Sequence, residues 1–140
     1  MTATAAQIAQ LRRMVNEPTA GIYSDAAIQT LIETYPLMDE LGTEPYYWDY
    51  TTEPPTKVDN ISWVPTYDLN AAAAVIWEEK ASVVAVDFDF SADGGSYTRS
   101  QVYDQYMAQA RRFASKRAAT TVQLRPYPRP LPTQIDQDLP

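Results

Sequence analysis

Apolar residues recur at helical spacing in two segments near the start of the chain, and each segment has its own start signal. In residues 4–15, Thr4 and Gln7 fit a capping box, in which each residue bonds the backbone of the other. In residues 24–35, Ser24 has the side chain of an N-cap. These patterns predict two short amphipathic helices.

Two longer helical segments follow in the second half of the chain. Residues 69–88 are apolar on nearly every side, which is typical of a central buried helix, and Asp68 is placed to cap its start. The pair Gly94-Gly95 then permits a sharp reversal. A fourth helix is predicted over residues 99–119, with basic side chains gathered toward its C-terminal end, where they suit the helix dipole.

The segment between the second and third helices combines prolines with aromatic residues. Its prolines, at positions 45, 54, 55 and 65, interrupt regular structure, and we expect a long ordered loop at about residues 43–66 with room for a short hairpin. So many aromatic residues are rare in a disordered linker. Either they cover the core of the protein itself or they contact a neighbouring subunit. The candidates for such a contact are Tyr46, Tyr47, Trp48, Tyr50 and Trp63.

The last residues, 120–140, predict an extended arm because prolines occupy positions 126, 128, 130 and 132. In an extended strand, successive amides point to opposite edges, so these prolines remove donors from one edge only. Tyr127, Arg129 and Leu131 keep their donors on the other edge. The arm is therefore suited to add to a partner's sheet as a strand. The alternative is a proline-rich end without a partner.

Together these elements predict an all-α fold. We expect a small four-helix, bundle-like domain over residues 1–119, with the loop inserted at about 43–66 and the arm at 120–140. A chain of 140 residues supports one domain with a modest core.

Composition removes several functional classes. The chain has no Cys and no His, so it lacks thiolate metal ligands and the commonest general base. Asp87, Asp89 and Asp93 are spaced like a calcium loop, but Ala92 and Thr98 stand where an EF-hand needs Gly and Glu. We expect no catalytic site, no metal and no cofactor. The N-terminus carries no signal-peptide pattern and no apolar run is long enough for a bilayer, so no membrane role is expected.

Charge is unevenly distributed along the chain. Residues 1–96 hold 15 acidic and 4 basic side chains, whereas residues 97–140 hold 3 acidic and 7 basic ones. This polarity favours electrostatic complementarity with a partner at one end, although a soluble acidic protein with a solvated basic helix has the same composition. An acidic chain also argues against tight wrapping of nucleic acid.

The order of elements in the second half resembles a known family. The alanine-rich run from Ala72 to Ala81 leads into an acidic Gly-Gly turn, and the phrase from Phe90 to Tyr103 opens the last helix. Over roughly residues 5–118 this pattern resembles the head–tail connector proteins of tailed bacteriophages, also called adaptor or head-completion proteins. The resemblance implies a structural virion protein of the neck, between capsid and tail, that is found in the host cytoplasm during assembly.

In that family, copies form a ring beneath the portal protein, usually of about twelve subunits. The ring extends the DNA channel and offers a docking surface to the next neck, stopper or tail protein. Genomic double-stranded DNA would pass through without sequence-specific binding, because an acidic lining repels phosphates. The candidate lining residues are Asp87, Asp89, Asp93, Glu44, Asp49 and Glu53.

Members of the family commonly grip the portal through a C-terminal segment. By position, residues 111–132 correspond to it here. The candidate portal-binding residues are Arg111, Arg112, Lys116, Arg117, Arg125, Tyr127, Arg129 and Leu131. An alternative function is a helical scaffold or regulatory module that binds another protein through its Pro-rich tail. A gene position just downstream of portal and major capsid genes would favour the connector.

Overall fold

The first two helices begin at the side chains that the sequence offers as caps. Helix α1 spans Ala5–Met14 and helix α2 spans Asp25–Glu33. The Thr4 hydroxyl accepts a bond from the Gln7 amide at 3.3 Å, and Gln7 Oε1 accepts one from the Thr4 amide at 2.8 Å. Ser24 caps α2 through a backbone N–H of its first turn. The predicted capping box and N-cap are confirmed.

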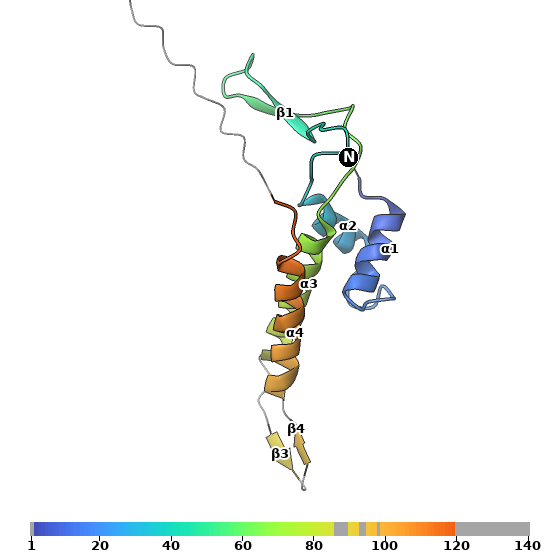
Figure 1. Ribbon diagram of the computed structural model, residues 1–140, viewed down its shortest axis with the longest axis vertical. Helices are drawn as coiled ribbons and strands as arrows, with labels where there is room; N and C mark the ends of the chain where they lie inside the picture. The colour runs from blue at the N-terminus through green and yellow to red at the C-terminus, as the bar shows by residue number, and fades with distance from the viewer. Residues whose placement is uncertain (1, 86–89, 93–94, 98, 120–140) are drawn as a thin grey trace, which may run out of the picture.

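The second half of the chain is a pair of antiparallel helices. The computed structural model describes residues 2–85, 90–92, 95–97 and 99–119. Helix α3 spans Leu69–Ala85 and helix α4 spans Arg99–Ala114. The two lie side by side and extend away from α1 and α2 as a stalk (Figure 1). The molecule is therefore elongated.

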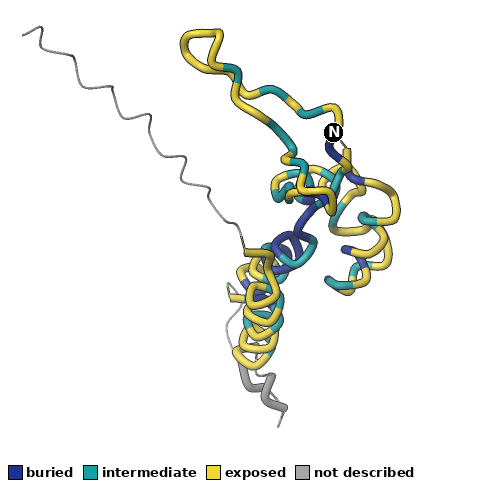
Figure 2. Tube along the Cα trace, turned by 45° about the horizontal axis from the view of Figure 1, so that its top comes forward, coloured by how far each residue is buried: buried dark blue, intermediate teal, exposed yellow. Residues whose placement is uncertain are grey.

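The core forms where α1, α2 and the first half of α3 meet. Buried side chains concentrate there, and the remainder of the stalk is mostly exposed (Figure 2). The core residues are Ala3, Leu11, Val15, Ile28, Ile32, Trp63, Tyr67, Ala72, Ala73 and Ile76. The prediction that α3 is buried throughout is wrong for its second half, where Val83 is 72% exposed. Besides α4, the residues that follow α1 lie against it, because Glu17 pairs with Lys80, and Ala81 is buried.

The all-α prediction is wrong, because the described residues also contain two small antiparallel sheets. Strands β1, Tyr46–Asp49, and β2, Thr56–Asp59, form one hairpin within the proline-rich loop. Strands β3, Phe90–Ala92, and β4, Gly95–Tyr97, form another at the far end of the stalk (Figure 1). The prolines near the first hairpin flank its strands without interrupting them, and its aromatic and β-branched residues favour extended backbone.

The helices do not form a four-helix bundle either. Among the described elements, α4 packs only against α3, whereas α1, α2 and α3 contact one another. Helix α3 is apolar on nearly all sides, so it accepts α1 and α2 on one side and α4 on another. Its alanines, which include Ala71 and Ala74, allow the neighbouring backbones to approach closely.

Candidate interaction surfaces

The β1–β2 hairpin projects from the end of the molecule opposite the β3–β4 hairpin (Figure 1). It carries large exposed aromatic side chains. Tyr47, Trp48 and Tyr50 are 55%, 50% and 68% exposed. Tyr46 is half-buried, with the Lys57 ammonium 3.6 Å from its ring centroid. Exposed Tyr and Trp side chains on one projecting element are typical of a protein–protein contact.

Trp63 belongs to the core and not to this exposed set. It is 5% exposed, its Nε1 donates to the Leu37 carbonyl at 2.8 Å, and its ring meets Tyr67 edge-on at 5.4 Å. The two interpretations of the aromatic loop thus apply to different residues. Tyr47, Trp48 and Tyr50 remain candidates for a subunit contact, whereas Trp63 covers the protein's own core.

The acidic candidates on the same loop lie on or beside the hairpin. Glu44 and Glu53 are exposed, and Asp49 is half-buried. The Asp49 carboxylate accepts bonds from the Thr51 hydroxyl at 2.6 Å and the Thr51 amide at 2.8 Å. These two bonds, the hydroxyl first, lower the pKa of Asp49 and hold its charge at the hairpin turn. The other acidic candidates, Asp87, Asp89 and Asp93, lie outside the described residues.

Four of the basic candidates lie near the end of the described residues. Arg111 and Arg112 lie in the last turn of α4, Lys116 and Arg117 follow it, and all four are exposed. The Arg117 guanidinium lies 5.5 Å from the Tyr35 ring centroid. The remaining candidates, Arg125, Tyr127, Arg129 and Leu131, lie outside the described residues.

The end of α4 is held against the start of α3 by two polar side chains. Asp68 Oδ1 accepts the Asn70 and Ala71 amides, both at 3.0 Å, and so caps α3 as predicted. Its other oxygen, Oδ2, accepts the Ala118 amide at 2.9 Å. Asn70 Nδ2 donates to the Lys116 carbonyl at 3.2 Å. One aspartate therefore fixes both the start of α3 and the position from which the basic segment leaves.

A groove of about 620 Å³ lies between the end of α2, the base of the β1–β2 hairpin and the segment after α4. It brings together residues that are far apart in the sequence, and its walls carry acidic and basic side chains and two tyrosine rings. Its lining residues include Tyr35, Glu44, Tyr46, Lys57, Arg117 and Ala119.

Asp39 organises a second surface that the sequence did not indicate. Its Oδ1 accepts the Leu41 and Thr43 amides at 2.9 and 2.8 Å, and its Oδ2 accepts the Val64 amide at 3.1 Å. Desolvation raises the pKa of Asp39, but these donors outweigh it and leave the pKa below its ordinary value. The joined loops expose several apolar side chains. These are Met38, Leu41, Ile61 and Val64.

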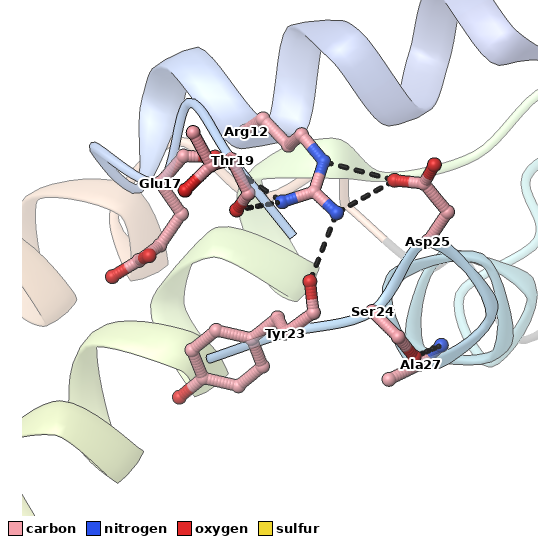
Figure 3. A network of polar contacts seen from close by, with 7 residues as sticks. All are labelled: Arg12, Glu17, Thr19, Tyr23, Ser24, Asp25 and Ala27. Carbon is pink, nitrogen blue, oxygen red and sulfur yellow. Dashed lines mark hydrogen bonds and ion pairs between the residues drawn. The ribbon is translucent and has the colours of Figure 1, made fainter. Parts of the chain in front are cut away.

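Arg12 of α1 is a further polar centre that local pattern did not reveal. Its guanidinium reaches Asp25 and the backbone carbonyls of Glu17, Thr19 and Tyr23 (Figure 3). The side chain is buried and ties the connection between α1 and α2 into one shape.

Lys80 of α3 lies on the apolar side of its helix because it pairs with Glu17. Nζ is 2.7 Å from Glu17 Oε1 and donates to the Val15 carbonyl at 2.6 Å; the two charged side chains are 14% and 13% exposed. Burial, together with a hydrogen bond to Glu79, raises the pKa of nearby Tyr23 to about 12. These partly buried groups join the α1–α2 connection to α3.

In the part of the chain that the structure describes, no cluster of three or more Asp or Glu side chains is placed to hold a metal ion. None of the described helices combines the length and hydropathy needed to cross a bilayer. Comparison of the chain with family models, with curated proteins and with solved structures finds no match.

Proposed function

We propose that the protein is a structural connector of a phage neck, which forms a ring under the portal protein and extends the DNA channel. The observation that carries the proposal is the presence of two exposed surfaces of different chemistry on one elongated chain. Exposed aromatic side chains gather on the β1–β2 hairpin, and exposed basic side chains gather in the last turn of α4 and just after it. A ring subunit needs at least two such surfaces, one for each neighbour, and a further one for its portal.

Charge supports a head-to-tail arrangement. The hairpin region carries Glu44, Asp49 and Glu53, whereas Arg111, Arg112, Lys116 and Arg117 lie at the end of α4. Contacts between unlike surfaces of successive copies are heterologous, and they close into a ring when the rotation between copies divides a full turn. Acidic side chains that face the channel would keep DNA phosphates from adhering to it.

The direct test is native mass spectrometry of the purified chain mixed with the portal protein encoded beside it. The connector proposal predicts a complex with about one copy of the chain per portal subunit. No complex at micromolar concentration, with both proteins folded, would refute the portal role. That result would favour the helical protein-binding module that acts through its Pro-rich tail.

A charge variant tests the surface after α4. Replacement of Arg111, Arg112, Lys116 and Arg117 by Ser removes exposed charges, so the fold should remain intact. We expect weaker portal docking or ring closure in the same mass spectra, with a reduced dependence on salt. The control is Arg13→Ser, which removes an exposed basic residue from α1. Normal assembly of the fourfold variant would exclude this surface from both contacts.

A further inference from the structure

The β1–β2 hairpin is a two-stranded sheet without a packing partner. Among the described elements, neither strand packs against a helix or against the other hairpin. A hairpin of two strands is marginally stable in water, and a third strand adds both backbone bonds and covered apolar surface. Its exposed aromatic side chains and free strand edges therefore form a surface suited to a further strand.

The ladder defines which backbone groups point outward. Asn60 donates its amide to the Pro45 carbonyl at 3.0 Å, and the register continues from this pair to Tyr46 opposite Asp59. Bonded and non-bonded pairs alternate in an antiparallel ladder, so Tyr46–Asp59 is a non-bonded pair, as is the pair that contains Lys57. The N–H and C=O groups of Lys57 and Asp59 consequently point out of the hairpin along the free edge of β2.

The groove places this hairpin beside the start of the C-terminal arm. Lys57 and Ala119 both line it. Strand β2 runs from the hairpin turn back toward the core at Trp63, so a chain that runs outward from Ala119 would lie antiparallel to it. Arg129 lies ten positions after Ala119 in the sequence, so it can reach up to about 33 Å from Ala119.

The arm's sequence fits a single-sided strand. Its prolines leave amide donors at Tyr127, Arg129 and Leu131, all of which would point to the same edge. Residues 120–135 contain two Arg and no acidic residue, whereas residues 44–59 contain four acidic residues and one Lys. The arm and the hairpin are therefore complementary both in backbone donors and in charge.

We propose that residues 122–132 add to β2 of the same chain as a third, antiparallel strand. In the register that we assign, Arg129 lies opposite Asp59 and Leu131 opposite Lys57. A shift by two residues would place Arg129 opposite Lys57, and like charges directly opposite each other are unfavourable. The outer edge of the arm lacks donors at its prolines, so the sheet ends there. This proposal does not depend on the connector role.

Amide hydrogen exchange of the full chain, followed by NMR, tests the pairing. We expect the Lys57 and Asp59 amides to be protected, since they would donate to the arm. Asp59→Arg and Arg129→Asp should each raise their exchange rates about two- to fivefold, and the double variant should restore protection. Glu53→Arg, the same charge change at the hairpin turn, should have no effect. The proposal would be overturned if the Lys57 and Asp59 amides exchanged as fast as the amide of exposed Ile22. It would also be overturned if all variants changed these exchange rates equally.

A spin label distinguishes pairing of β2 with the arm of the same chain from pairing with the arm of another copy. The chain has no Cys, so Thr133→Cys carries one nitroxide. In the labelled chain, we expect broadening of the Lys57 and Asp59 amides but not of Ala9 on α1. Broadening that occurs only when isotope-labelled chain is mixed with spin-labelled chain would show exchange between copies and overturn the assignment to one chain.

Discussion

Arg12→Ala should destabilise the protein far more than its single ion pair would suggest. The Arg12 guanidinium donates to the Glu17 carbonyl at 3.2 Å, to the Thr19 carbonyl at 2.7 Å and to the Tyr23 carbonyl at 2.9 Å. It also reaches Asp25 Oδ1 with two nitrogens, at 3.0 and 2.6 Å. One side chain therefore satisfies three carbonyls of the segment between α1 and α2.

The carbonyl bonds account for most of the expected loss. A net contribution of about 1 kcal/mol for each of the three gives about 3 kcal/mol. The ion pair adds at most about 1 kcal/mol, because the Asp25 side chain is 71% exposed and water screens it. Water reaches part of the freed backbone, so the expected decrease in the free energy of unfolding is about 2–4 kcal/mol. Asp25→Ala should cost about 1 kcal/mol or less.

Urea unfolding monitored by tryptophan fluorescence measures these differences. Arg13→Ala is the matched control, since Arg13 is exposed on the same helix and should change stability by about 0.5 kcal/mol or less. Arg12→Lys keeps the charge but loses the planar fork, so it should fall between wild type and Arg12→Ala. If Arg12→Ala matched Arg13→Ala, or if Asp25→Ala cost as much as Arg12→Ala, this account of the network would be refuted.

Substitutions at three further places test the core, the loops that Asp39 joins, and the Lys80–Glu17 ion pair. Trp63→Ala should lower the free energy of unfolding in urea by about 3–5 kcal/mol, because Trp63 lies in the core. Trp48 is half-exposed, so Trp48→Ala should lower it by about 0.5 kcal/mol or less. Similar losses for the two variants would contradict this difference in burial. The pKa of Asp39 is lowered in the folded protein, so its ionised carboxylate stabilises the fold at pH values above the ordinary carboxyl pKa. This stabilisation is lost as the pH falls through the lowered pKa. The difference in the free energy of unfolding between wild type and Asp39→Asn should therefore narrow on acidification from neutral pH. A gap that is independent of pH would exclude this linkage. Lys80→Met should lower the free energy of unfolding by about 3 kcal/mol, because it leaves the largely buried Glu17 carboxylate without its ion-pair partner. Adding Glu17→Leu to the same chain should recover most of this loss. No recovery would argue against the pairing.

Several local features of this fold could be predicted because their causes lie within a few residues. Thr4, Gln7 and Ser24 bond to the backbone of their own first helical turns, so helix starts follow from short patterns. Apolar spacing of three to four residues identified the first two helices for the same reason. The sequence predicted the basic side chains within a helix over residues 99–119, but α4 ends at Ala114, so Lys116 and Arg117 follow it. The sequence also could not show that Asp68 fixes the chain there.

The fold class could not be predicted from those patterns. Prolines near residues 45–55 predicted a long ordered loop with room for a short hairpin, and two strands do pair between them. The pattern could not give their pairing, because it depends on the register of both strands. The second half of α3 looked buried by composition, but burial requires a neighbour on each side. Ala81 is buried and Lys80 pairs with Glu17, whereas Val83 is 72% exposed.

The sequence by itself determined where helices begin and which side chains are able to pack; tertiary structure decided which of them do. Trp48 and Trp63 belong to the same aromatic segment, yet one is half-exposed on a projecting hairpin and the other lies in the core beside Tyr67. Lys80 likewise stands in an apolar stripe because Glu17, distant in sequence, meets it there. Burial and charge pairing depend on segments brought together by folding, so no short stretch of sequence contains them.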